Sequence, residues 1–172
     1  MRTDELALDY IERAGLTLEE AKSAFEKEAY SLAIRRAQET CELSLKGALR
    51  YLAIEYPRDH DVSDVLIKVK EIRQVPEWFH KKIEFMARVS SDLASKRGPA
   101  FYRIERSVTP ASTIFGRDEG LRARRGAEDV FKLIRNFTKS HAILNILPFH
   151  RLSSLPRSII DAATRTTPRP AI

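Results

Sequence analysis

Residues 29–66 of the chain read AYSLAIRRAQETCELSLKGALRYLAIEYPRDHDVSDVL. Their apolar side chains return every three or four positions, a spacing that indicates an α-helix with one buried face. These positions are Ile34, Ala37, Cys41, Leu45, Ala48 and Leu52. The charged residues between them predict an opposite, fully polar face, made of Arg35, Arg36, Glu39, Glu42, Lys46 and Arg50. We therefore predict a long amphipathic helix, for which Ser31 is a suitable N-terminal cap.

Helical spacing continues on both sides of this stretch. Before it, the residues from Leu6 to Phe25 predict a first long helix, in which Gly15 and Thr17 mark a possible break or kink. After it, Asp61 or Ser63 can open a short helix. The apolar side of that short helix consists of Val62, Val65, Leu66, Val69 and Ile72.

Two more helices are predicted in the second half of the chain. One begins after Pro76 and should end where Gly98 and Pro99 interrupt it. Its inward residues are Trp78, Phe79, Ile83, Met86, Val89 and Leu93. The stretch 100–117 is less regular and predicts a loop with a turn of helix. The last helix begins at about Asp118, and its apolar stripe is Ala123, Ala127, Val130, Ile134 and Phe137.

These patterns predict an all-α fold, because no alternating strand pattern is long enough to compete. Short connections make neighbouring helices run in opposite directions, so we expect an antiparallel up-and-down bundle of four to five helices. The bundle should occupy residues 1–142. Residues 143–172 differ, since they hold half of the eight prolines and end in TRTTPRP. They predict a basic, partly irregular C-terminal tail.

Charge is distributed unevenly along the chain. Residues 1–120 carry 20 Lys and Arg against 21 Asp and Glu, a net charge of −1. Residues 121–172 carry 10 against 3, a net charge of +7, which accounts for the overall +6. An excess of this kind indicates either a polyanionic or acidic partner, or a solvated helix face followed by a basic tail.

Composition limits the class of protein. With Cys41 as the one cysteine, there is no disulfide framework and no cysteine-based zinc site. The N-terminal residues lack the basic and then apolar pattern of a signal peptide, and no apolar run is long enough to span a membrane. We expect a cytoplasmic protein without membrane contact. His60, Asp61 and Asp64 are more typical of a helix start than of a metal site, so no metal or other cofactor is expected.

The stretch 29–66 also resembles the HEPN family, small helical proteins of prokaryotes that occur as modules in higher eukaryotes. A second segment, SDLASKRGPAFYRIE at residues 91–105, is similar to the segment after the family's next long helix. The residues that carry the resemblance are Ala33 or Ala37, Glu42, Lys46, His60, Asp61, Arg97 and Tyr102. The resemblance implies a helical bundle, commonly a homodimer. It also implies one of three activities: nucleotide binding, partnership with a nucleotidyltransferase in a toxin–antitoxin context, or RNA cleavage without a metal.

RNFTKSH, residues 135–141, matches the Arg-x(4–6)-His motif of the RNA-cleaving members. In that chemistry His141 takes a proton from a 2′-hydroxyl, Arg135 stabilises charge on the phosphate, and Asn136 holds the substrate or orients the histidine. However, counting predicts about 1.4 chance matches in a chain of this composition. A second match joins Arg73 to His80. On an unbroken helix Arg135 and His141 would also point about 120° apart.

Two functions therefore remain open. The first is a dimeric module that binds the phosphate of a nucleotide or RNA, or docks a nucleotidyltransferase, and in which Arg135 touches phosphate. The second is a metal-independent endoribonuclease that uses Arg135, Asn136 and His141. The candidate phosphate-binding residues are Arg35, Arg36, His60, Asp61, Arg97, Tyr102, Arg122, Arg125, Lys132 and Lys139.

Overall fold

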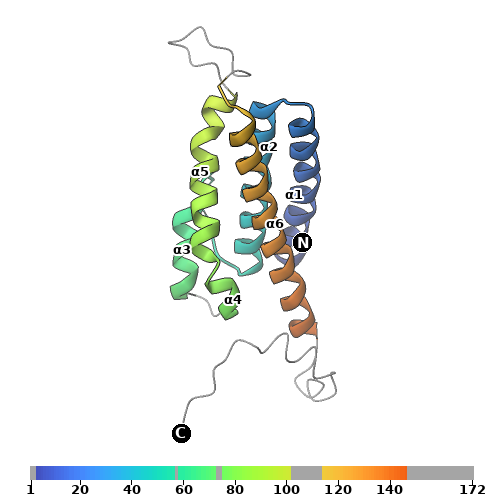
Figure 1. Ribbon diagram of the computed structural model, residues 1–172. Helices are drawn as coiled ribbons and strands as arrows, with labels where there is room; N and C mark the ends of the chain where they lie inside the picture. Colours follow the sequence, from blue (N-terminus) through green and yellow to red (C-terminus); the bar gives the residue numbers. More distant parts are fainter. Residues whose placement is uncertain (1–2, 57, 73–74, 102–113, 147–172) are drawn as a thin grey trace.

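The computed structural model describes residues 3–56, 58–72, 75–101 and 114–146 (Figure 1). They form α1 (Thr3–Glu26), α2 (Tyr30–Tyr51), α3 (Ser63–Ile72), α4 (Glu77–His80), α5 (Ile83–Phe101) and α6 (Arg117–Ile146). No strand occurs in these residues, so the all-α prediction is confirmed. None of the described helices combines enough length with enough apolar character to cross a membrane.

The helix α2 lies at the centre of the bundle. It packs against α1, α5 and α6, and the four long helices run along a common axis in Figure 1. The short α3 packs beside α5, and α4 leads into α5 at one end of the bundle. Fourteen of the 22 residues of α2 are buried, among them Gln38, Thr40, Ser44 and Lys46. The polar face predicted for this helix is therefore partly enclosed by its neighbours.

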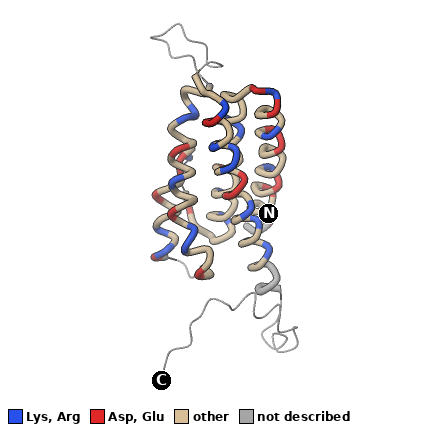
Figure 2. Tube along the Cα trace, viewed as in Figure 1, with Lys and Arg blue, Asp and Glu red and all other residues tan. Residues whose placement is uncertain are grey.

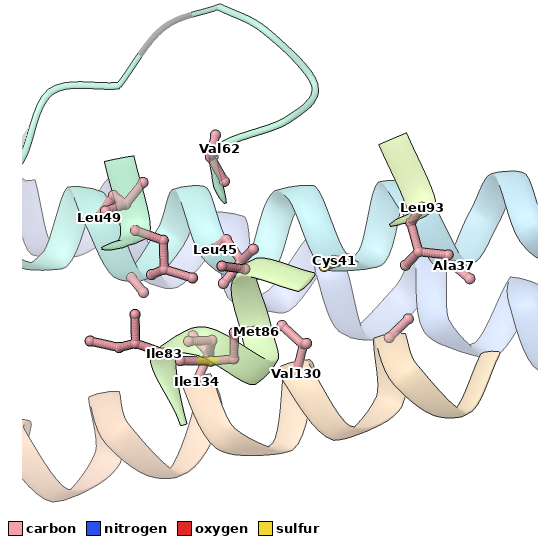
Figure 3. Packing of buried hydrophobic residues seen from close by; sticks show 14 of the residues in the cluster. Ala37, Cys41, Leu45, Leu49, Val62, Ile83, Met86, Leu93, Val130 and Ile134 are labelled. Atoms are coloured by element: carbon pink, nitrogen blue, oxygen red, sulfur yellow. The ribbon is translucent and has the colours of Figure 1, made fainter. Parts of the chain in front are cut away.

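The predicted apolar stripes meet in one core between α2, α5 and α6 (Figure 3). Ile34, Leu45, Met86 and Ile134 are completely buried. Burial of a side chain of this size stabilises the folded state by about 1.5–3 kcal/mol. At one end of the core the ring of Phe137 stacks on Phe79, with 4.1 Å between their centroids. The periodicity of the sequence thus identified the buried faces correctly.

The first helix has no break, because the residues expected to interrupt it are used for packing. A Cβ atom on Gly15 would lie 3.3 Å from the ring of Phe131, so the glycine allows α1 and α6 to approach closely. The Thr17 hydroxyl donates to the Arg13 carbonyl oxygen at 2.9 Å, which satisfies it inside the helix.

Other predicted helix ends also differ from the structure. Ser31 is buried in the first turn of α2, and the N-cap is Ala29, which makes no side-chain hydrogen bond. The helix predicted after Pro76 is divided by a turn at Lys81 and Lys82 into α4 and α5. This turn allows Phe79 to enter the core.

The helix α5 runs past its predicted end. α5 continues through Gly98 and Pro99 to Phe101. Proline removes only one amide donor, and within a turn of the helix end that loss is local. α6 continues to Ile146. The remaining predictions for the loop at 102–113 and for the tail from 147 onward concern residues outside those described.

Candidate phosphate-binding site

A polar groove lies alongside α2, and no residue of α6 lines it. It has a volume of about 290 Å³. Three elements join α2 around it: α1, the connection between α2 and α3, and α5. The lining residues are Arg13, Arg35, Arg36, Gln38, Glu39, Glu42, Leu43, His60 and Arg97. Four arginines and a histidine thus face two glutamates, which favours an anionic ligand. We call this hollow the arginine groove.

Glu42 organises the floor of the arginine groove. Its carboxylate accepts hydrogen bonds from Lys46 Nζ at 2.8 Å and from Gln38 Nε2 at 2.9 Å. His60 Nδ1 lies 2.9 Å from the same carboxylate. Burial alone would raise the pKa of Glu42, but the hydrogen bonds from Lys46, Gln38 and His60 outweigh it and hold the pKa below its ordinary value. Glu42 therefore stays ionised and fixes the His60 ring at the edge of the groove.

Asp61 fixes the segment that carries His60. Its carboxylate accepts the backbone N–H of Ser63 and the hydroxyl of Ser90, each at 2.9 Å. Burial would raise the pKa of Asp61, and these hydrogen bonds lower it below its ordinary value. Asp61 thus ties the start of α3 to α5. It does not line the arginine groove, so its part in a site is to position its neighbour.

The four arginines of the groove differ in how they are paired. Arg36 bonds Glu20 at 2.9 Å and Glu39 at 2.8 Å. Arg13 Nη1 lies 3.6 Å from the Asp9 carboxylate. Arg97, in contrast, has no ion-pair partner among the residues that the structure describes, and its Nε is buried without an acceptor. A guanidinium whose charge no carboxylate balances is well suited to bind an added anion.

The candidate residues of α6 lie elsewhere. Arg122, Arg125, Lys132 and Lys139 are all exposed and line no part of the arginine groove. Figure 2 shows basic residues repeated along α6. Lys132 bonds Glu128 at 3.0 Å. The structure thus brings together Arg35, Arg36, His60 and Arg97, and separates them from the α6 cations. Tyr102 falls outside the described ranges.

The RNFTKSH stretch lies within the unbroken helix α6. Thr138 donates back to the Ile134 carbonyl at 3.1 Å, so it supports the helix and does not interrupt it. Arg135 and Asn136 are exposed, and His141 is six positions on in the same helix. Positions six residues apart on an α-helix are about 120° apart around its axis, so the motif does not place its two positions on one face of α6. His80 lies in α4, whereas Arg73 is not among the described residues.

Several contributors to the site were missed at the sequence level. Gln38 stands four residues before Glu42, a spacing that places side chains together on a helix and could have indicated this contact. Arg13 and Ser90 carry no such signal, because they reach the site from α1 and α5. Only the tertiary packing brings them close.

No other catalytic grouping is evident in the described parts of the chain. No three His, Cys, Asp or Glu side chains there are grouped closely enough to hold a metal ion. Burial, helped by the charges of Asp61 and Glu42, raises the pKa of the Cys41 thiol far above its ordinary value. Cys41 is thus a packed, protonated core residue.

The fold and groove define an all-helical bundle protein with a cationic hollow along its central helix. The family model for the HEPN domain matches residues 7–139, so the chain belongs to the HEPN family. No curated protein matches the sequence.

Two solved structures share the fold. The crystal structure of TT1696 from Thermus thermophilus superposes with a TM-score of 0.62 at 23% identity, over 76% of this chain and 96% of that one. ST0689, an archaeal HEPN homologue, has a TM-score of 0.57 at 20% identity, over 77% of this chain and 97% of that one.

Proposed function

We propose that this HEPN-domain protein is a binding module that holds the phosphate groups of a nucleotide or of RNA in the arginine groove. The observation that carries the proposal is Arg97, whose guanidinium faces the groove without a partner among the described residues. Arg35 and Arg36 face the same hollow from α2. Guanidinium groups match phosphate oxygens with paired, charge-assisted hydrogen bonds.

The size of the arginine groove limits which ligands it can hold. At about 290 Å³ it lies near the lower end of the range for small-molecule sites. That volume suits one mononucleotide, or one or two units of a single strand, and is too small for a duplex. Because Glu39 and Glu42 share the groove, the site favours a ligand with donors as well as phosphates over a bare polyanion.

The family resemblance also bears on which proteins this chain binds. The HEPN resemblance supports a homodimer and docking to a nucleotidyltransferase, in a toxin–antitoxin context, as further parts of this proposal. A binding module of this kind requires no catalytic pair within one copy. The rival function, a metal-independent endoribonuclease, requires Arg135 and His141 to converge. Positions six residues apart on one α-helix are about 120° apart around its axis, so cleavage would depend on a second copy.

Binding can be tested by titrating the full-length protein into a fluorescently labelled nucleoside triphosphate and, separately, a labelled single-stranded RNA oligomer, both with EDTA present. Arg97→Gln should weaken binding of both ligands by about tenfold or more, because one charge-assisted contact is lost. Lys68→Gln is the matched control, since Lys68 is exposed on α3 outside the groove.

The result against the proposal is equally definite. If Arg97→Gln binds both ligands as tightly as the wild type, the arginine groove is not the site. If the RNA is cut in EDTA and His141→Ala abolishes the cutting while binding is kept, the protein is a ribonuclease. Thermal melts of each variant show whether a loss of binding reflects a loss of folding.

A further inference from the structure

The arginine groove has two unlike ends, and contacts across the bundle show which residues share a level. His60 Nδ1 lies 2.9 Å from the carboxylate of Glu42 in α2. The Ser90 hydroxyl of α5 donates to the next residue, Asp61, at 2.9 Å. Because His60 and Asp61 are consecutive, Glu42 and Ser90 lie at nearly the same level along the bundle axis.

Three of the arginines lie together at one end of the groove. α2 and α5 run in opposite directions (Figure 1). Arg35 is seven residues before Glu42 in α2, which is about 10 Å along the helix. Arg97 is seven residues after Ser90 in α5, so it is displaced by the same distance toward the same end of the bundle. We call this part of the groove, formed by Arg35, Arg36 and Arg97, the cationic end.

The other end of the groove, where Glu42 and His60 lie, is electrically balanced. Lys46 donates to Glu42 at 2.8 Å, so this carboxylate already has its counter-charge. The fourth arginine, Arg13, has Asp9 as its partner, with 3.6 Å between Nη1 and the carboxylate. We call this part the balanced end.

Arg13 belongs to the balanced end because of how α1 lies against α2. These two helices also run in opposite directions (Figure 1), and the ion pair between Arg36 Nε and Glu20, at 2.9 Å, fixes their relative level. Arg13 is seven residues before Glu20 in α1, so it lies about 10 Å away from the cationic end. Among the residues that the structure describes, a positive charge without an ion-pair partner thus occurs at the cationic end, on Arg97.

A terminal phosphomonoester fits the cationic end better than an internal phosphodiester does. A phosphomonoester has three free oxygens and a charge of about −1.5 to −2 at neutral pH, whereas a diester has two free oxygens and a single charge. Arg35 and Arg97 come from different helices, so they can bind different oxygens of one group. If a strand ran through the groove, its next phosphates would lie beside Glu39 and Glu42, which repel them.

We infer that the cationic end of the arginine groove recognises a terminal phosphomonoester, and that the attached nucleoside lies toward the balanced end. This inference rests on the proposed phosphate binding and names the class of ligand for that same site. A mononucleotide and the 5′-phosphorylated end of an RNA strand both present the required group.

The test compares two short RNA strands of one sequence, labelled at the 3′ end, of which one has a 5′-phosphate and the other a 5′-hydroxyl. Fluorescence anisotropy with the full-length protein in EDTA should show at least about tenfold tighter binding of the phosphorylated strand, because it gains charge-assisted hydrogen bonds. Arg97→Gln should bring the ratio of the two affinities close to one. Arg13→Gln is the matched control, since it removes the same charge at the balanced end and should keep the ratio.

Competition with unlabelled adenosine monophosphate distinguishes the two sources of the group. The monophosphate should displace the phosphorylated strand at concentrations at which adenosine has no effect. If the monophosphate binds as tightly as the strand, a free mononucleotide is sufficient as the ligand. If the strand binds at least about tenfold more tightly, the ligand is a phosphorylated RNA end, to which other surfaces of the protein add contacts. A monophosphate that does not displace the strand would overturn the inference.

Two further results would overturn the inference, and a third would overturn the proposed function with it. Equal binding of the two strands, with both weakened by Arg97→Gln, would mean that the groove holds internal phosphates, so that the proposed function stands without the inference. A preference for the 5′-phosphate that Arg97→Gln reduces no more than Arg13→Gln does would place the terminal phosphate outside the cationic end. If Arg97→Gln weakens the binding of neither strand, the arginine groove is not the site. Circular dichroism confirms that each variant folds.

Discussion

At the scale of single residues, the sequence pattern predicted the position of Glu42 correctly but did not predict its burial. It was predicted on a polar helix face, and that face is where it lies. Yet its side chain is only 15% exposed and binds Lys46, which is 10% exposed. The charged pair is therefore mostly enclosed, and it connects the central helix to the His60 segment.

Glu42→Gln should lower the free energy of unfolding by about 1–3 kcal/mol, because Lys46 would remain a mostly buried cation without its counter-charge. Urea denaturation measures the change. Glu39→Gln is the control, since Glu39 is 41% exposed and pairs only at the surface with Arg36. Equal losses of unfolding free energy in the two variants would show that burial of the Glu42–Lys46 pair does not affect stability.

The same residue should make stability depend on acid pH. The ordinary pKa of the Glu42 carboxyl is 4.5, and in the folded state it is lower. The folded protein thus favours the ionised form, and this contribution is complete above the ordinary pKa and lost as pH falls through the folded pKa. Urea midpoints measured from neutral pH downward should therefore converge for the wild type and Glu42→Gln. A gap between them that widens in acid would contradict this account.

At the scale of helices, the hydrophobic periodicity predicted which segments are helical and which faces are buried. The glycine and proline residues did not predict where the helices end. Ile34, Met86 and Ile134 are buried as predicted, because burial of one face selects the helical spacing. Gly15 and Pro99 failed as helix breakers. Tertiary packing decides what a glycine does, and one proline near a helix end costs a single hydrogen bond.

Two glycines test this view in opposite directions. In the centre of the bundle, a Cβ atom on Gly47 would lie 3.0 Å from Ile11 Cγ1 and 3.2 Å from the Ala7 carbonyl oxygen. Gly47→Ala should therefore destabilise the protein by about 1–3 kcal/mol through overpacking. Gly98 lies in α5 with nothing within 4 Å of an added Cβ, so Gly98→Ala should stabilise it by about 0.5–1 kcal/mol. Calorimetric melting of both variants provides the comparison, and shifts of the same sign would refute it.

At the scale of the whole molecule, charge counting located one basic surface and missed the other. The excess in the last third predicts the exposed cations of α6, which the structure places along that helix. The arginine groove draws Arg13, Arg35, Arg36 and Arg97 from a part of the chain whose net charge is −1. A cluster assembled from three helices is invisible to net charge, because acids elsewhere in the same segments cancel it.

The arginine groove and the basic surface of α6 lie on different parts of the bundle. Substitution of an α6 residue should therefore affect the binding of a nucleotide and of RNA differently. A nucleoside triphosphate is too small to contact both the groove and Arg135, so Arg135→Ala should leave its binding unchanged. RNA long enough to reach α6 should bind more weakly to Arg135→Ala, and the slope of log affinity against log salt should fall by about 1. Titrations of both ligands at several salt concentrations measure this. An equal loss for both ligands would place the nucleotide on α6.

If phosphate binds in the arginine groove, a bound nucleotide should perturb the backbone amides that line the groove. Amide chemical shifts of the isotope-labelled protein, followed by NMR during titration with a nucleoside triphosphate, report the contact residue by residue. We expect shifts at Arg35, Gln38, His60 and Arg97, and no shifts at residues 132–139 of α6. Shifts confined to residues 132–139, with the groove unmoved, would contradict this expectation.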